Sequence, residues 1–538
     1  MRHWMMLGWA AAGCGGDGRD EGSDGVAPAP LGPEAPPAEV LGIANLDDDD
    51  EDGTVDWEQA GVAGDNDLAA WAIPGDPAPD GASWVFALSG PGAEAVRVYG
   101  PDGALLLDAA SPEATLPARA DGLALGVEFG GFLTSGTLSL RRVEADGAET
   151  DAWSAALLSA PLVLNHHLQS ADLVMAMESA GSGSRSNAAM IQDFRDALRE
   201  RFIGYPLQSY GYDVWVQDEI EFGTLTAPGL FMDLVINSVR SEGSGLDPLP
   251  ARAFAGPDFA VGTWGRGRVT SQDSFGNLEV SPPVAVGGVE YPLGRVYWGE
   301  WRGKGLTDDL ADLLIAQKVQ APFVLDVSFL CVGHVDEVST FVPDPTAPRG
   351  FRFYFSDALL GLALVDAQDP SLALTRYADG HGYATAGEMQ DDAALRAYNE
   401  DIQANHLDPM LEVFRAELAL TDDEIIRVPA LYEESRWCGG DALALIPATV
   451  NMTVSPVDGT THLFLPDPFF RTDVGDPSSD PVIAAMEDLF PADAELHWVD
   501  NWYLYHLAAG EVHCGSNTIR PPAASWETSA RHLLGGAP

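Results

Sequence analysis

Basic side chains, cysteines and long apolar runs are all scarce in this 538-residue chain. Lys and Arg total 28, whereas Asp and Glu total 82, which gives a formal net charge of −54. A surface this acidic repels nucleic-acid phosphates and anionic membranes, and it attracts divalent cations and cationic groups such as arginine side chains. An alternative is that most of the excess of acidic over basic residues is an adaptation to salt or serves solubility. Because no basic patch interleaved with aromatic residues is present, the sequence predicts no nucleic-acid partner.

The cysteines are too few for a disulfide framework and form no C-x-x-C zinc motif. Cys331 lies in an apolar segment and Cys438 follows a tryptophan in a loop, and we interpret both as inert thiols. Cys514 differs, because it lies between His513 and Gly515 in a polar segment. That setting makes Cys514 a candidate nucleophile.

No apolar run reaches the roughly 18 to 20 residues of a transmembrane helix. The N-terminus still resembles an export signal, because Arg2 and His3 precede a short apolar run and small residues lead to Cys14. This order resembles a bacterial lipoprotein cleavage site, at which a lipidated Cys14 would tether the protein to a membrane. An ordinary cleaved secretory signal is the alternative. We therefore expect residues 1–14 to be a signal and the protein to be secreted or anchored to the cell envelope.

Composition divides the remaining chain into three parts. Residues 15–38 are rich in Gly, Asp, Ser, Pro and Ala and predict a disordered linker. Short alternating apolar runs over 39–155 predict a β-sandwich. Residues 156–538 mix helical and strand periods and predict an α/β or α+β domain. One helical face, with Ser186 or Asn187 as its cap, comprises Met190, Ile191, Phe194, Ala197 and Leu198. We find no sequence repeat.

The acidic segment at residues 45–56 resembles a calcium loop. Its carboxylates alternate along the chain, as at Asp47, Asp49 and Asp56, and Gly53 allows a sharp turn. Such oxygen ligands wrap around a hard cation. A solvated acidic linker is the alternative.

A second acidic segment, residues 215–221, crowds three carboxylates among apolar neighbours, and mutual repulsion requires a cation there. If this segment is extended, Glu219 and Glu221 share one face and Asp218 points to the other. One strand would then serve a metal site and a substrate site. An edge strand whose charges discourage aggregation is the alternative.

The segment 332–337 follows a strongly apolar run and contains a His-x-Asp pair. In an extended segment His334 and Asp336 face the same way, which suits a proton shuttle beside a carboxylate that holds a cation. Taken by itself, the pair is better explained by a structural histidine.

Taken together, these segments resemble the catalytic domain of the peptidylarginine deiminases. The matching stretches, in the order of the family, are 215–221, 256–259, 273–283, 291–295, 332–337, 380–382, 450–452 and 505–517. The resemblance implies a five-bladed α/β propeller preceded by an immunoglobulin-like β-sandwich domain. It also implies that an arginine guanidinium in a protein or peptide is converted to a ureido group, with release of ammonia.

The resemblance also assigns roles to residues. Asp218 and Asp336 would hold the guanidinium, Cys514 would attack its carbon, and His334 would transfer protons. Trp215 would pack on the aliphatic stem of the substrate. The substrate-side residues depart from the family in part, because the arginine that grips the peptide backbone falls near Glu242, and its neighbour is kept as Arg240.

Two calcium (Ca²⁺) sites are implied by the same resemblance. The first comprises the side chains of Gln217, Glu221 and Glu279 and the carbonyl oxygens of Phe275 and Leu278. The second comprises Glu219, Asn237, Ser238 and Ser241. In the second set a family Asp is Asn237 and a family Asn is Ser241. The loss of a carboxylate weakens attraction for a hard cation.

The leading prediction is therefore a secreted or envelope-anchored, calcium-dependent protein-arginine deiminase. Hydrolysis of free arginine or another small guanidino compound is the second hypothesis, prompted by Glu242. Amidino transfer to an amine is a third. A non-enzymatic, calcium-stabilised surface protein is the fourth, and Cys514 argues against it because a binding module needs no nucleophile.

Overall fold

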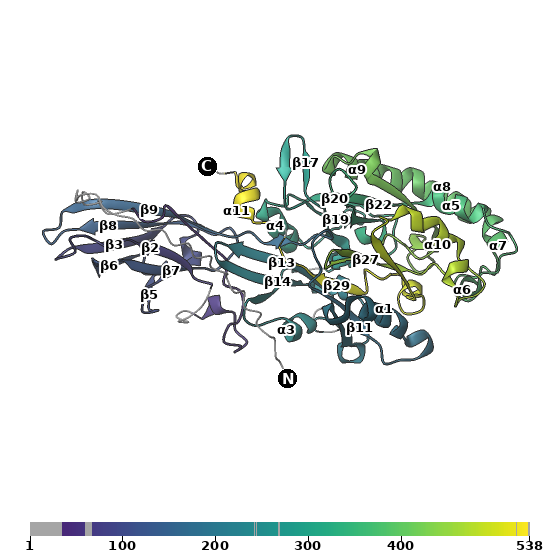
Figure 1. The fold of residues 1–538 in the computed structure, drawn as a ribbon, viewed down its shortest axis with the longest axis horizontal. Coiled ribbons are helices and arrows are strands. Elements are labelled where there is room, and N and C mark those ends of the chain that lie inside the picture. Colours follow the sequence, from purple (N-terminus) through teal and green to yellow (C-terminus); the bar gives the residue numbers. More distant parts are fainter. Residues whose placement is uncertain are drawn as a thin grey trace, which may run out of the picture.

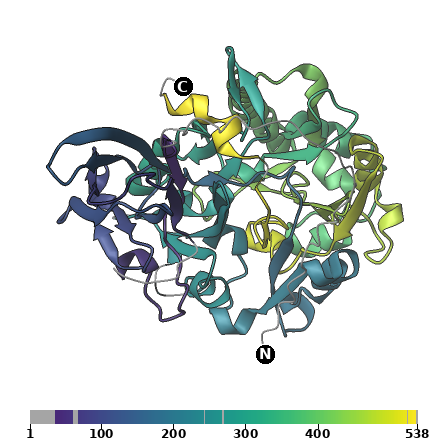
Figure 2. The ribbon, with the colours of Figure 1, turned by 60° about the vertical axis from the view of Figure 1, so that its left-hand side comes forward.

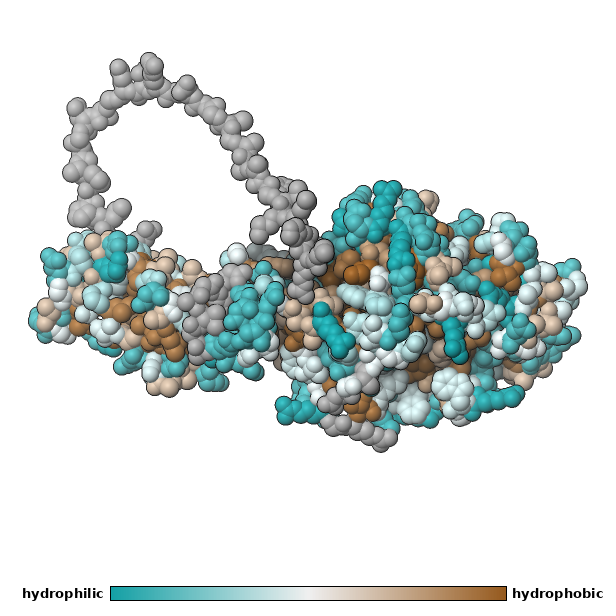
Figure 3. Space-filling view, turned by 90° about the horizontal axis from the view of Figure 1, so that it is seen from below, coloured by the Kyte–Doolittle hydropathy of each residue, from teal (hydrophilic) through white to brown (hydrophobic). Residues whose placement is uncertain are grey.

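The computed structural model describes residues 35–59, 67–241, 243, 245–266, 269–522 and 524–535. The predicted signal and most of the linker, Cys14 included, lie outside these residues. The molecule is elongated, with a β-rich part at one end and a larger mixed α/β part at the other (Figure 1). On the face in Figure 3, hydrophobic residues lie scattered among hydrophilic ones. Across the described residues, no helix has the length and apolar character that crossing a bilayer requires.

Two sheets from the N-terminal part pack around one apolar core that includes Trp71, Phe86 and Phe129. The alternating burial along Ser83–Ser89 is the two-residue period that the sequence predicted. One sheet has the order β1 (Glu39–Gly42), β9 (Glu149–Ser159), β8 (Ser135–Val143), β3 (Ser83–Ser89) and β6 (Glu113–Pro117). The other has the order β2 (Ala69–Ile73), β7 (Leu123–Phe129), β4 (Val96–Tyr99) and β5 (Leu105–Leu107). Because β9 continues past residue 155, the predicted domain boundary falls inside a strand, and the domain division stays a prediction.

The rest of the chain repeats one strand arrangement. In each of five small sheets of the described residues, a middle strand pairs antiparallel with one neighbour and parallel with the other. The middle strands are β11 (Leu173–Glu178), β14 (Leu230–Asn237), β19 (Val296–Glu300), β22 (Phe351–Asp357) and β27 (Thr460–Pro466). This structural repeat has no counterpart in the sequence.

The strands on either side of each middle strand complete this arrangement. The antiparallel partners, in the same order, are β29 (Ser516–Ile519), β13 (Ile220–Ala227), β16 (Leu278–Val280), β21 (Ser339–Pro343) and β26 (Thr453–Val457). The parallel partners are β12 (Phe202–Pro206), β15 (Phe259–Thr263), β20 (Phe323–Asp326), β23 (Ile425–Pro429) and β28 (Ala494–Val499). Short additional strands are β10 (Val163–Leu164), β17 (Val284–Val286), β18 (Val289–Tyr291), β24 (Tyr432–Glu434) and β25 (Ala442–Ala444).

One helix begins where the sequence predicted it. Helix α1 (Ala188–Leu198) follows Asn187, and Met190, Ile191 and Phe194 are buried on one face. The other helices are α2 (Val216–Glu219), α3 (Leu249–Ala253), α4 (Asp308–Gln317), α5 (Ala358–Asp366), α6 (Thr375–Gly380), α7 (Ala386–Gln390), α8 (Ala393–Ile402), α9 (Asp408–Leu418), α10 (Pro481–Met486) and α11 (Trp526–Ser529).

The C-terminal segment lies where the two parts meet (Figure 2). Trp526 is fully buried in a cluster that also contains Ile43 and Leu225, and Arg531 forms an ion pair with Glu39. One apolar cluster therefore spans the junction and fixes the two parts against each other.

Candidate active site

Cys514 lies just before β29 and is only 5% exposed. It lines a cavity together with Asn451, Trp437, His506 and Glu511. The Nδ2 atom of Asn451 donates a hydrogen bond to Sγ at 3.2 Å. Burial, reinforced by nearby carboxylates, raises the pKa of the Cys514 thiol well above its ordinary value. The thiol is therefore held protonated until positive charge arrives beside it.

The acidic segment after Trp215 is a helical turn, so the prediction of an extended segment was wrong there. Residues 216–219 form α2, and the strand begins only at Ile220. Successive residues of a helical turn point about 100° apart. As a result, Asp218 faces His334, with 3.4 Å between Oδ1 and Nδ1, while Glu219 faces Arg240. Glu219 and Glu221 therefore do not share a face.

Asp336 lies on a 3₁₀ turn, Val335–Glu337, and His334 directly precedes this turn with an extended backbone. The Nε2 atom of His334 lies 2.9 Å from the carbonyl oxygen of Ser271 and donates to it, which leaves Nδ1 facing Asp218. Burial works to lower the pKa of His334, but the surrounding carboxylates outweigh it and raise that pKa. These carboxylates therefore favour the protonated form of the imidazole.

Gly276 is the residue on which these side chains converge. A Cβ atom at Gly276 would lie 2.8 Å from Oδ1 of Asp218, 2.8 Å from Nδ1 of His334 and 3.1 Å from Oδ2 of Asp336. Sequence reasoning included this glycine in a matching stretch but gave it no role. Only an unsubstituted backbone fits against the three polar groups.

Buried carboxylates dominate the electrostatics of the site. Burial raises the pKa of Asp218, and it raises the pKa of Glu337 to about 7. The Oδ2 atom of Asp336 accepts a hydrogen bond from Nδ1 of His513 at 3.0 Å and lies 3.4 Å from Sγ of Cys514. The arrangement can bind a planar cation beside a thiol and an imidazole.

The first predicted calcium set converges in the structure. Nε2 of Gln217 lies 3.1 Å from Oε2 of Glu221 and 3.3 Å from the carbonyl oxygen of Phe275. Gln217, Glu221 and Glu279 line one small cavity, and Leu278 directly precedes Glu279 in β16. Burial raises the pKa of both Glu221 and Glu279 to about 8. Two buried carboxylates and neutral oxygen donors around one cavity fit a hard cation such as calcium.

The second predicted calcium set does not fit a cation in this arrangement. The guanidinium of Arg240 lies 2.9 Å from Oε2 of Glu219 and also binds Asp213 at 2.8 Å. Asn237 donates to Asp247, and the Ser238 hydroxyl donates to the carbonyl oxygen of Asp273. The side chain of Ser241, and Glu242 as a whole, lie outside the described residues. Arg240 supplies the positive charge that a second ion would bring.

The acidic loop brings together carboxylates other than those predicted from simple alternation. Ligand atoms of Asp48, Asp50 and Asp56 lie within 4.8 Å of one another. Asp49 instead donates its backbone N–H to Asp56, and Asp47 accepts the backbone N–H of Asp258. The chain turns here as predicted, and Gly53 has a positive φ of 90°. Of the predicted trio, Asp56 lies in this cluster.

Trp215 is half-buried and packs edge-on against Tyr505, with 5.7 Å between the ring centroids. Gly510 lies so close that a Cβ atom there would approach the indole to 2.4 Å. The tryptophan is thus fixed by the segment that leads to Cys514. Arg240, the second predicted substrate residue, donates to the carbonyl oxygen of Trp215 at 3.3 Å.

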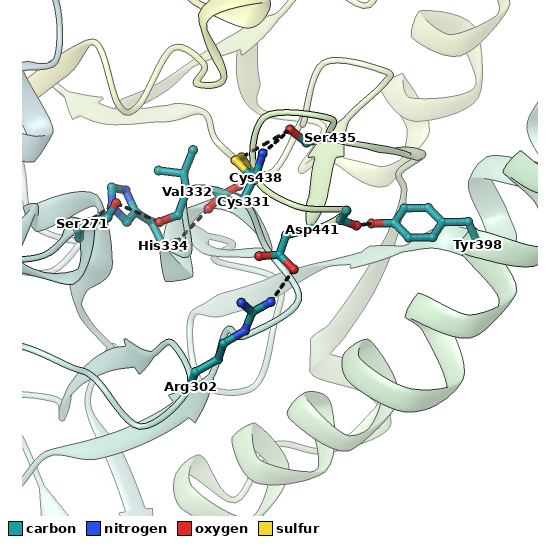
Figure 4. Close-up of a disulfide and its surroundings, with 11 residues drawn as sticks. Ser271, Arg302, Cys331, Val332, His334, Tyr398, Ser435, Cys438 and Asp441 are labelled. Atoms are coloured by element: carbon teal, nitrogen blue, oxygen red, sulfur yellow. Dashed lines mark hydrogen bonds and ion pairs between the residues drawn. A yellow bond between two sulfur atoms is a disulfide. The ribbon is translucent and has the colours of Figure 1, made fainter.

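A disulfide joins Cys331 to Cys438, so the interpretation of both as inert thiols was wrong (Figure 4). The two residues are 107 positions apart in sequence, a separation across which pairing cannot be inferred from local pattern. Cys331 directly precedes the segment that carries His334, and Cys438 follows Trp437 of the Cys514 cavity. Ser271 bonds to the segment after Cys331: its hydroxyl donates to the carbonyl oxygen of Val332, and its carbonyl oxygen accepts from Nε2 of His334 (Figure 4). The disulfide therefore ties the histidine segment to the cavity wall.

Comparison with known proteins agrees with this arrangement. The family model described as Protein-arginine deiminase (PAD) matches residues 152–527, more than half of the chain. The chain belongs to the protein-arginine deiminase family. Protein-arginine deiminase type-4 of Homo sapiens is 34% identical over 329 residues, which cover 58% of this chain and 47% of the relative. Protein-arginine deiminase type-3 of Homo sapiens is 35% identical over 331 residues, with coverage of 58% and 47%. The chain spans about half the length of the curated relatives it matches.

Proposed function

We propose that this protein hydrolyses the guanidinium of arginine residues in proteins and peptides, giving citrulline and ammonia. The observation that carries the proposal is the convergence of Asp218, His334 and Asp336 at Gly276, with Cys514 beside Asp336. Membership of the protein-arginine deiminase family supports the same reaction class.

Substrate binding would begin with the carboxylates. Asp218 and Asp336 each accept hydrogen bonds from guanidinium nitrogens, and such charge-assisted, paired contacts are strong and directional. The positive charge of the substrate offsets the carboxylates that raise the pKa of Cys514. Binding of the correct cation therefore favours the thiolate, and the nucleophile is activated only when a substrate is present.

The first chemical step forms a bond between Sγ of Cys514 and the guanidinium carbon. The C–N bond to one terminal nitrogen then breaks, and protonated His334 gives its proton so that the nitrogen leaves as ammonia. The product of this step is a covalent amidino-thioether. The raised pKa of His334 supports this role because the surrounding carboxylates favour the charged imidazole that donates the proton.

The second step consumes water. His334, now neutral, takes a proton from a water molecule as its oxygen attacks the same carbon. The C–S bond breaks, the thiolate of Cys514 is restored and citrulline leaves. One water enters, and ammonia leaves together with the proton that carried the charge of the guanidinium, as ammonium, so atoms and charge balance.

Calcium would be held by Gln217, Glu221, Glu279 and the carbonyl oxygens of Phe275 and Leu278. When bound, it would supply positive charge that keeps two buried carboxylates ionised. The Arg240–Glu219 ion pair supports the proposal that this chain needs no second ion at Glu219.

Three finer features belong to the same proposal. The recurring strand arrangement supports a five-bladed α/β propeller, and the two N-terminal sheets support an immunoglobulin-like β-sandwich. The Cys331–Cys438 disulfide supports export, because disulfides persist in oxidising compartments. A secreted protein, or one attached to the cell envelope through Cys14, would lie in such an oxidising compartment.

The test measures citrulline formation from an arginine-containing peptide and from free arginine. Each substrate is assayed with calcium and with chelator, and Cys514→Ala is the control. We expect calcium-dependent product from the peptide and none from the variant. Product from free arginine alone would favour the second candidate, small-molecule hydrolysis, which Glu242 at the position of a family arginine prompts. Product from neither substrate would contradict both.

A further inference from the structure

Two histidines and a glutamate form a buried cluster behind the thiol. Nε2 of His167 lies 3.5 Å from Oε2 of Glu279, and Nε2 of His513 lies 3.6 Å from Oε1 of the same carboxylate. The ligand atoms of all three groups lie within 4.8 Å of one another. The proposed deimination uses neither imidazole as a proton donor or as a nucleophile.

The separations suit a metal ion better than hydrogen bonds. Hydrogen bonds between nitrogen and oxygen are about 2.7 to 3.2 Å long. Zinc–nitrogen and zinc–carboxylate distances are about 2.0 to 2.2 Å, so two ligand atoms of a tetrahedral site lie roughly 3.3 to 3.6 Å apart. The two Nε2–Oε distances, which run to different oxygens of Glu279, exceed the length of a hydrogen bond and are close to the second range.

The opposite nitrogen of each ring is already engaged. Nδ1 of His167 lies 3.1 Å from Oγ1 of Thr340, and Nδ1 of His513 lies 3.0 Å from Oδ2 of Asp336. Metal-binding histidines typically donate the other ring N–H to such a partner, which fixes the ring and leaves a lone pair on the ligating nitrogen. Both Nε2 atoms are thereby directed at Glu279.

We propose that His167, Glu279 and His513 bind a divalent transition metal of the zinc class. Two imidazoles and one carboxylate form a typical three-ligand zinc set, and the fourth position opens into a cavity lined by Asn165 and Glu221. The guanidinium of Arg520 lines the same cavity and opposes a further cation, while Glu221 offsets it.

A metal ion bound by His167, Glu279 and His513 would affect the proposed deimination. Glu279 belongs to the calcium set as well, so the two metals compete for one carboxylate. A metal on His513 also places positive charge one hydrogen bond away from Asp336, which weakens the attraction of that carboxylate for guanidinium. Zinc therefore acts as an inhibitor that calcium relieves. This regulatory part rests on the proposed function, whereas metal binding does not.

The experiment titrates Co²⁺ into calcium-free protein and records its visible absorption, which is intense for tetrahedral coordination and displaced by Zn²⁺. Every protein in this experiment carries His497→Asn, because a second cluster able to hold a metal comprises His462, Glu495 and His497. We expect one equivalent bound, at least tenfold weaker binding in His167→Asn, and no change in His532→Asn, whose imidazole lies outside the cluster. Thr340→Val tests the supporting hydrogen bond and should weaken binding by roughly 10- to 100-fold.

Unchanged Co²⁺ affinity in folded His167→Asn, or a weak octahedral spectrum, would overturn the site. Co²⁺ affinity that calcium leaves unaltered would overturn the competition for Glu279. A zinc assay of citrulline formation is run separately, with inhibition expected in the parent protein and relieved in His167→Asn. Because absorption does not depend on turnover, an inactive protein would contradict the proposed function and leave the metal site standing.

Discussion

The Oδ2 atom of Asp336 lies 3.4 Å from Sγ of Cys514. Burial and a carboxylate this close to the thiol oppose formation of the thiolate, so the free site favours the protonated thiol. The same oxygen also receives the hydrogen bond of His513, which holds the carboxylate in place. Asp336 thus both suppresses the free thiol and, in the proposed reaction, binds the cation that releases it.

Alkylation of Cys514 tests this suppression. Because the thiol pKa is raised above 9.0, modification by iodoacetamide should be slow near neutral pH and still increase in the alkaline range. Asp336→Asn removes one cause of the raised pKa, so alkylation at neutral pH should become several-fold faster. Mass spectrometry of the Cys514 peptide measures both rates, and Asp488→Asn is a surface control. A fast rate that does not vary with pH in the parent protein would contradict a protonated thiol.

Gly276→Ala should abolish most activity while the protein stays folded. The added Cβ atom would approach Asp218, His334 and Asp336 to about 3 Å, and displacement of these groups by a fraction of an ångström disrupts substrate alignment. Misplacement of about 1 Å can reduce rates by roughly 100-fold. Citrulline assays and thermal melts measure the two effects. Gly382→Ala is the matched control, because it has open space around the new carbon although its φ is positive. Full activity in Gly276→Ala would show that the three groups do not need their present positions.

Arg240→Gln should destabilise the protein strongly, because it leaves the fully buried Glu219 without its cation. Removing one partner of a buried ion pair typically lowers the free energy of unfolding by roughly 3 to 5 kcal/mol. The double variant Arg240→Gln with Glu219→Gln should recover much of that loss. Chemical denaturation of the two single variants and the double variant gives the coupling free energy. Additive losses in the double variant would argue against the pair.

Reduction of the Cys331–Cys438 disulfide should lower the free energy of unfolding by about 2 to 5 kcal/mol. The bond closes a long loop and anchors the segment that carries His334, so activity should fall along with stability. Unfolding curves with and without reductant measure the change, and Cys331→Ser combined with Cys438→Ser should make the protein insensitive to reductant. Equal stability in all of these forms would show that the bond adds nothing.

Local patterns predicted local structure well and long-range contacts poorly. The start of α1 after Asn187 and the apolar face of this helix were evident because a helix is encoded within a dozen residues. The Asn187 side chain, however, does not cap the helix and instead bonds Ser179, Met177 and Tyr505. The bend at α2 was missed, because a single helical turn leaves too short a period to distinguish from a strand. The Cys331–Cys438 bond and the approach of Gly276 to three polar side chains both depend on segments that only the complete fold brings together.

The segments that build the site are also far apart in the chain, and the thiol comes after all the others. β29 begins two residues after Cys514 and pairs antiparallel with β11, which precedes Asp218, His334 and Asp336 in the chain. During synthesis, these three residues are therefore made well before Cys514, and a partially made chain lacks the thiol on which the proposed reaction depends. The site is complete only when the strand that follows Cys514 pairs with β11.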